Sequence, residues 1–104
     1  MPAEPASNTY DETKVAIIIP LYNDEANIAR ALESAVAQKP PEGIRFEILV
    51  VDDGSQDAGP EIAEDYARRF DNVTFLKMVQ NGGPAAARNR ALRETDAGWF
   101  TPFD

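Results

Sequence analysis

The strongest candidates for catalysis or ligand binding are the adjacent acids Asp52 and Asp53, which directly follow the mostly apolar run Phe46–Val51. Two neighbouring carboxylates at the end of a strand lower its local stability, and a turn alone does not need them, so we expect both to be functional. Asp24 and Asp57 stand where helices are expected to begin. There a carboxylate caps free N–H groups and complements the helix dipole, so we expect a structural role for these two.

A basic segment follows the third apolar run, in the order Asn81-Gly82-Gly83-Pro84 and then Arg88. The glycines allow the backbone to approach a ligand closely, and a helix N-terminus next to an arginine suits a phosphate. The alternative is that the glycine pair only turns the chain. Arg90 and Arg93 fit a solvated helix face, whereas Arg88 lies nearest the loop and is the better candidate for binding.

The composition limits the available chemistry. The chain has 104 residues, no cysteine, no histidine and a formal net charge of −8. Imidazole or thiolate catalysis, thiolate metal sites and disulfides are therefore excluded, and a general nucleic-acid binder is disfavoured. There is also no G-x-G-x-x-G pattern and no P-loop lysine motif, which disfavours dinucleotide oxidoreductases and P-loop enzymes. Carboxylates, arginines, hydroxyls, backbone amides and a bound cation remain.

The length fits one small α/β domain. Residues 1–13 carry two prolines and no hydrophobic periodicity, which predicts a flexible arm. No signal-peptide pattern or membrane-spanning apolar run is present, so we expect a cytoplasmic location. The periodicity predicts strands over 14–19, 46–51, 73–79 and 99–103, and helices over 24–38, from Pro60 and over 84–93.

This alternation of strand and helix predicts a three-layer α/β/α domain with a mostly parallel sheet. The carboxyl ends of parallel strands meet at one edge, where such sheets bind ligands. The edge would gather the acids Asp24, Glu25, Asp52, Asp53 and Asp104. Crowded carboxylates need a cation or several N–H donors nearby. The sequence therefore predicts that this edge binds either a divalent metal or a ligand rich in N–H groups.

Four segments in this order resemble the amino-terminal half of the family 2 glycosyltransferases, which have the Rossmann-like GT-A fold. They are AIIIPLYNDE at 16–25, FEILVVDDGSQD at 46–57, NGGPAAARNRAL at 81–92 and WFTPFD at 99–104. The resemblance covers about residues 14–104. It implies transfer of a sugar from a nucleotide diphosphate sugar, usually UDP-linked, to an acceptor that the sequence does not identify, with Mg²⁺ or Mn²⁺.

Carried over by position, the resemblance also implies roles for individual residues. Pro20, Tyr22 and Glu25 would line the nucleoside pocket, although packing is an equal alternative for Tyr22. Asp52 and Asp53 would accept hydrogen bonds from the base and ribose, with the assignment between them open. Asn81, Gly83 and Arg88 would lie beside the base and the diphosphate, and Asp104 would be the first acid of the D-x-D metal motif.

The second D-x-D acid, the acceptor-binding half and the catalytic base are expected beyond residue 104. We therefore expect residues 14–104 to be a donor-binding half that does not transfer sugar by itself. A non-catalytic nucleotide-binding module is the alternative. A receiver-type signalling domain is disfavoured, because its paired acids should follow the first strand. An uncovered sheet edge also predicts association with a second copy of the chain.

Overall fold

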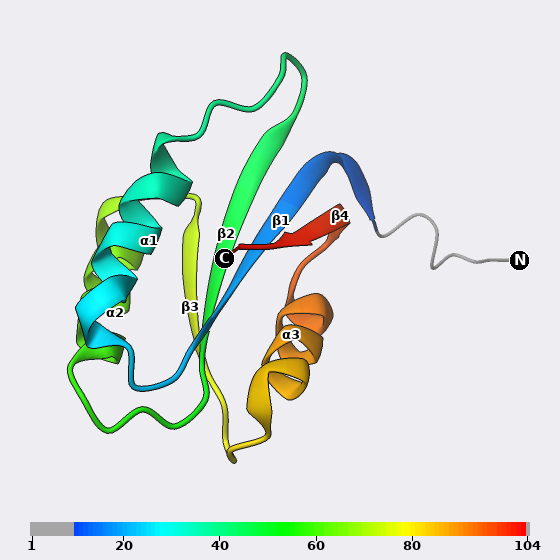
Figure 1. Ribbon diagram of the computed structural model, residues 1–104. Coiled ribbons are helices and arrows are strands. Elements are labelled where there is room, and N and C mark those ends of the chain that lie inside the picture. Colours follow the sequence, from blue (N-terminus) through cyan, green and yellow to red (C-terminus); the bar gives the residue numbers. More distant parts are fainter. Residues whose placement is uncertain (1–9, 104) are drawn as a thin grey trace, which may run out of the picture.

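The computed structural model describes residues 10–103, in which strands and helices alternate along the chain (Figure 1). The elements are β1 (Asp11–Leu21), α1 (Glu25–Ala37), β2 (Arg45–Asp52), α2 (Gly59–Arg69), β3 (Val73–Lys77), α3 (Gly83–Glu94) and β4 (Ala97–Pro102). No helix within this part of the chain is long and apolar enough to cross a membrane.

The strands form one sheet in the order β3-β2-β1-β4, and each neighbouring pair is parallel. Helices α1 and α2 cover one face of the sheet and α3 covers the other, as Figure 1 shows. The predicted three-layer α/β/α architecture is thus confirmed. All strand ends that lead into helices lie at one edge, called here the carboxyl edge.

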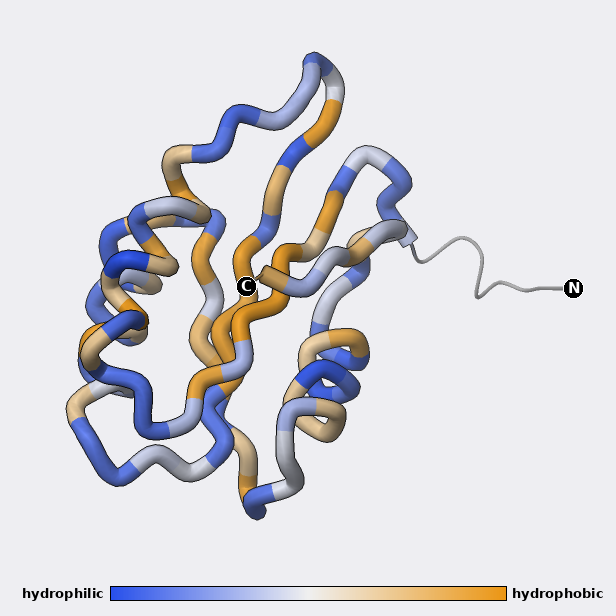
Figure 2. The backbone as a smooth tube through the Cα atoms, viewed as in Figure 1, coloured by the Kyte–Doolittle hydropathy of each residue, from blue (hydrophilic) through white to orange (hydrophobic). Residues whose placement is uncertain are grey.

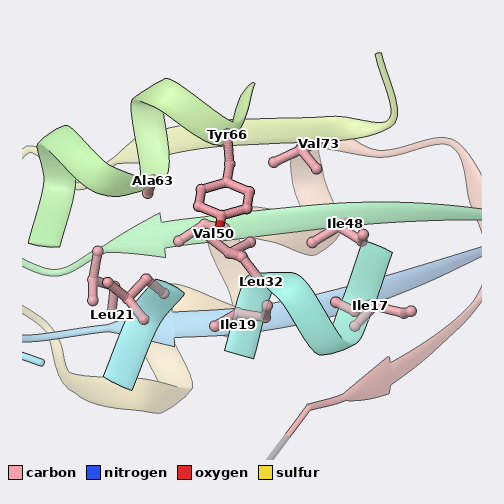
Figure 3. Packing of buried hydrophobic residues seen from close by; sticks show 11 residues of the cluster. Ile17, Ile19, Leu21, Leu32, Ile48, Val50, Ala63, Tyr66 and Val73 are labelled. Carbon is pink, nitrogen blue, oxygen red and sulfur yellow. The ribbon is translucent and has the colours of Figure 1, made fainter. Parts of the chain in front are cut away.

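The core is divided by the sheet, because alternate residues of β1 and β2 point to opposite faces. Ile17, Ile19, Ile48 and Val50 point toward α1 and α2, where Leu32 and Tyr66 pack against them (Figure 3). The second cluster, on the α3 face, consists of Ala16, Ile18, Leu49, Val51, Ala87 and Ala91. Apolar residues accordingly concentrate along the central strands in Figure 2, and polar residues in the loops.

The ends of the strands differ from the sequence-based boundaries. β1 begins at Asp11, so residues 11–13 belong to a strand, and residues 1–9 of the predicted arm lie outside the described part. β1 also continues through Pro20, which is paired with Val51. The last pair between β1 and β4 is Ile18↔Pro102, and Pro20 lies beyond it. A backbone N–H at position 20 would therefore have no hydrogen-bond partner in β4, so proline is tolerated there.

Candidate functional site

The adjacent acids at the end of β2 point in different directions and make different contacts. The Asp52 side chain is fully buried, and its carboxylate accepts hydrogen bonds from the N–H groups of Gly54 and Ser55, with contacts of 3.3 Å. Asp52 therefore stabilises the turn that directly follows its own strand.

The carboxylate of Asp53 accepts hydrogen bonds from residues much further along the sequence. Its Oδ1 accepts from the N–H of Gly82 at 2.9 Å, and its Oδ2 accepts from the N–H of Gly83 at 2.8 Å. The Asp53 backbone N–H donates to the carbonyl of Leu21 at 2.9 Å. Asp53 thus joins the ends of β1 and β2 to the start of α3.

Asn81 lies against the same turn. A Cβ placed on Gly54, whose φ is +92°, would stand 2.0 Å from Asn81 Oδ1. Only glycine fits there, both because of the left-handed backbone and because of the close approach of Asn81. The loops after β2 and β3 are therefore in direct contact.

A hollow of about 400 Å³ opens at the carboxyl edge between the β1–α1 loop and the start of α3. It is lined by Pro20, Leu21, Tyr22, Asp24, Asp53, Gly83, Pro84 and Ala87. Four of these, Pro20, Tyr22, Asp53 and Gly83, are binding residues expected from the sequence. Tyr22 is 55% exposed, so more than half of its surface is accessible to solvent.

The other expected residues within the described part of the chain do not line this hollow. Asn81 lines a neighbouring hollow of about 410 Å³ together with Arg90 and Arg93. Arg88 is exposed on α3. Arg90, expected only to face solvent, is partly buried and donates to the Lys77 carbonyl at 2.9 Å and to Glu94. Asp104, the proposed metal ligand, lies outside the described residues.

The capping expectation is correct for Asp57 and wrong for Asp24. Asp57 accepts from the N–H of Gly59 at 2.9 Å and from the N–H of Glu25 at 3.0 Å, so one carboxylate serves the N-termini of both α2 and α1. Asp24 stands at the N-cap position of α1, but its side chain caps no backbone N–H. Its carboxylate accepts instead from the side-chain amide of Asn27 at 2.8 Å. In the first turn of α1 the Glu25 N–H donates instead to the carboxylate of Asp57.

The crowding of acids at this edge does not by itself produce a metal site. Within residues 10–103 there is no group of three or more acidic side chains placed to hold a cation. Asp52, Asp53 and Asp57 accept hydrogen bonds from backbone N–H groups of the loops instead. N–H groups of the chain itself therefore meet part of the hydrogen-bonding capacity of these three carboxylates.

Neither Asn23 nor Ser55 is among the site residues expected from the sequence. Asn23 has φ +48°, its N–H donates to Ser55 Oγ at 2.8 Å, and its Oδ1 accepts from the N–H of Gln56 at 2.8 Å. An asparagine in the loop after a strand is a signal for a left-handed residue, because Asn adopts this conformation more readily than most residues. That signal could have pointed to Asn23.

Nucleotide-binding α/β proteins with a parallel sheet bind their ligand in a hollow at the carboxyl ends of the strands, and this chain has that arrangement. The model of the glycosyl transferase family 2 matches residues 16–104. The chain belongs to this family, and its fold is that of the GT-A glycosyltransferases.

Several family members are similar to the chain. Glycosyltransferase AglE of Haloferax volcanii is 38% identical over 81 residues, which are 78% of this chain and 26% of AglE. Residues 1–349 of Staphylococcus aureus TarS, solved in complex with UDP-GlcNAc, give a TM-score of 0.74 at 34% identity, over 86% of this chain and 25% of that one.

A third similar protein is the mannosyltransferase PcManGT of Pyrobaculum calidifontis, solved in complex with GDP-Man and Mn²⁺. It gives a TM-score of 0.69 at 28% identity, over 84% of this chain and 26% of that one. The chain thus spans about a quarter of the length of each of these three proteins.

Proposed function

We propose that the chain is the donor-binding region of a glycosyltransferase, which transfers a sugar from a nucleotide diphosphate sugar, a UDP-sugar, to an acceptor hydroxyl. The observation that carries the proposal is the hollow at the carboxyl edge, because Pro20, Tyr22, Asp53 and Gly83 line it together. The UDP-GlcNAc in the TarS structure supports the choice of donor.

Each lining residue suits one part of such a donor. The exposed ring of Tyr22 would stack on the base. Asp53 uses both carboxylate oxygens for backbone N–H groups, and each oxygen keeps a second lone pair to accept from the base or ribose. Gly83 has no side chain to obstruct the diphosphate, and a Cβ placed on it would meet nothing within 4 Å. Arg88, further along α3, would approach the diphosphate from outside.

The proposed metal is Mg²⁺ or Mn²⁺. The described residues do not form a cation site by themselves, so this part of the proposal rests on Asp104 and on the Mn²⁺ in the mannosyltransferase structure. A divalent cation held with the help of Asp104 would offset the negative charge that develops on the leaving diphosphate.

We further propose that this chain binds the donor without transferring its sugar. An inverting transfer needs a carboxylate within hydrogen-bond reach of the acceptor hydroxyl. At the carboxyl edge, Asp52, Asp53 and Asp57 accept backbone hydrogen bonds that hold the loops, and the remaining lone pairs of Asp53 are assigned to the base or ribose of the donor. Release of free sugar or transfer from a UDP-sugar by the purified 104-residue chain would contradict this part of the proposal.

The main experiment is a calorimetric titration of the chain with UDP, with and without Mn²⁺. Tyr22→Ala is expected to weaken UDP binding by about tenfold or more, because base stacking on an aromatic ring contributes about 1–3 kcal/mol. Tyr10→Ala is the matched control, since Tyr10 is 57% exposed and Tyr22 55% exposed, but Tyr10 precedes β1 at the opposite edge of the sheet. Absence of UDP binding, or equal losses in the two variants, would refute the proposal.

A further inference from the structure

The loops that follow β1 and β2 are joined by side chains from both sides. Asn23 donates its N–H to Ser55 Oγ and accepts from the N–H of Gln56, both at 2.8 Å. Glu25 accepts from the N–H of Ala58 at 2.7 Å. We call the four residues whose side chains join the two loops the inter-loop clasp: Asn23, Glu25, Ser55 and Asp57.

The Glu25 and Asp57 half of the clasp is reciprocal. Each carboxylate accepts a backbone N–H at the start of the other helix: Asp57 from Glu25 at 3.0 Å, and Glu25 from Ala58 at 2.7 Å. Two carboxylates are tolerated so close together because both lie at helix N-termini, where the free N–H groups and the helix dipoles favour negative charge. The N-termini of α1 and α2 are thereby held in one fixed relation.

The Asn23 half of the clasp determines the path of the chain next to Tyr22. With φ at +48°, Asn23 turns the backbone sharply after β1, and its two hydrogen bonds hold that turn against the β2–α2 loop. Tyr22 lies between this turn and Leu21, the last residue of β1, whose carbonyl accepts from the Asp53 N–H. The backbone is thus fixed on both sides of a side chain that is itself 55% exposed.

We infer that the inter-loop clasp is a positioning device for the nucleotide hollow, with Asn23 as its central positioning residue. The inference rests on the proposed function. None of the four clasp side chains lines the hollow, so they act through Tyr22 and Asp53. A half-exposed ring whose backbone is already fixed loses less conformational freedom when a base stacks on it, and binding is correspondingly tighter.

The test compares UDP titrations of the 104-residue chain and three variants, well below their melting temperatures. Asn23→Ala removes the acceptor and also strains the left-handed backbone, so UDP affinity is expected to fall about tenfold. Asn23→Gly keeps this backbone without strain and loses only the acceptor, so the loss should be smaller. Asn72→Ala is the control, because Asn72 also bonds a backbone group, the Phe46 carbonyl, but lies at the opposite edge.

Amide ¹⁵N relaxation provides the second measurement. In the original chain the Tyr22 amide should be as ordered as that of Leu21, whereas in Asn23→Ala the Tyr22 amide should become mobile while α1 and α2 stay ordered. A purely structural role for Asn23 would lower the unfolding temperature without changing UDP affinity or the order of Tyr22, and that result would overturn the inference.

The same experiment separates the inference from the proposed function. If the original chain binds UDP and Asn23→Ala binds it equally well, the clasp is not a positioning device although the proposed function stands. If the original chain does not bind UDP at all, the proposed function fails, and the inference fails with it. If Asn72→Ala weakens UDP binding as much as Asn23→Ala, the effect is not specific to the clasp and the inference is wrong.

Discussion

At the scale of single residues, neighbouring acids differ in role because of what their oxygens meet. Asp52 is fully buried and bonded within its own turn, whereas Asp53 reaches the start of α3 and lines the hollow. The two residues are adjacent in sequence and face opposite sides of the strand end. Asp53 is therefore the one that combines a structural bond with access to a ligand.

Asp53→Asn is expected to lower the free energy of unfolding by about 1–3 kcal/mol, because the amide keeps one acceptor oxygen and leaves the N–H of Gly82 or Gly83 without a partner. Urea unfolding measures this loss. The control is Asp71→Asn, an exposed acid at the opposite edge of the sheet, expected to change stability by less than about 0.5 kcal/mol. Equal effects in the two variants would show that the bonds of Asp53 contribute nothing.

The position of Asp52 and Asp53 could be predicted from the sequence, but their partners could not. A strand followed by two acids places them at the carboxyl edge once the sheet is parallel. Which N–H groups meet them depends on loop conformations such as the left-handed backbones of Gly54 and Gly83, which no periodicity indicates. For the same reason the role of Asn23 was not anticipated.

At the scale of elements, helices and strands were predicted because continuous apolar runs indicate covered strands, and apolar spacing of three to four indicates helices. The order, parallel pairing and three layers followed from these patterns and are confirmed. The boundaries were less predictable, since they depend on tertiary partners. Residues 11–13 are polar but extend β1, whose Asp11 pairs with Ala97 of β4.

The contact between the β2–α2 and β3–α3 loops can be tested with two glycines. Gly43→Ala should cost about 1–2 kcal/mol, the penalty for a side chain in a left-handed backbone, because a Cβ there meets nothing within 4 Å. Gly54→Ala should cost clearly more, because its Cβ would also overlap Asn81 Oδ1. Urea unfolding of both variants gives the difference.

A double variant checks the cause of that difference. Removing the amide group with Asn81→Ala in the Gly54→Ala background should restore part of the lost stability, since the overlapping atoms belong to the Asn81 amide group. Additive losses in the double variant would contradict a direct clash between these two residues.

At the scale of the whole molecule, ion pairs near the amino-terminal ends of the strands make stability depend on pH. The hydrogen bond from Lys14 lowers the pKa of Asp96, and hydrogen bonds from Thr13, together with Arg45, lower the pKa of Asp11. Stability from a lowered carboxyl pKa is complete above the unfolded value of about 3.9 and is lost as pH falls through the lower folded value.

The melting temperature is therefore expected to decrease as the pH falls below about 4, and the decrease should be smaller in Asp96→Asn, which lacks one of these carboxylates. The bond to Asp96 also raises the pKa of Lys14, so that contribution is lost as pH rises through the folded value of Lys14, above about 10.4. Thermal melts of both proteins across pH provide the measurement. Parallel acid curves would rule out a role for Asp96.

The edge strand β4 exposes two large aromatic rings. Trp99 is 61% exposed and Phe100 50% exposed. We expect the chain to self-associate through this edge, more strongly as salt screens its net charge of −8. Light scattering at increasing salt should show dimers or larger species, and Trp99→Lys should reduce them. A monomer at every salt and protein concentration would contradict this expectation.

The inter-loop clasp has a consequence for engineering this domain. Asn23 and Glu25 accept hydrogen bonds from the backbone of the β2–α2 loop, and Asp57 accepts one from the backbone of α1. The conformation of each loop therefore depends on side chains of the other. Grafting one of them from a homologue, to alter the proposed donor preference, would leave the other without its partners. The two loops should therefore be exchanged together. Libraries that randomise either loop alone will mostly contain variants in which the loops at the carboxyl edge do not fit each other.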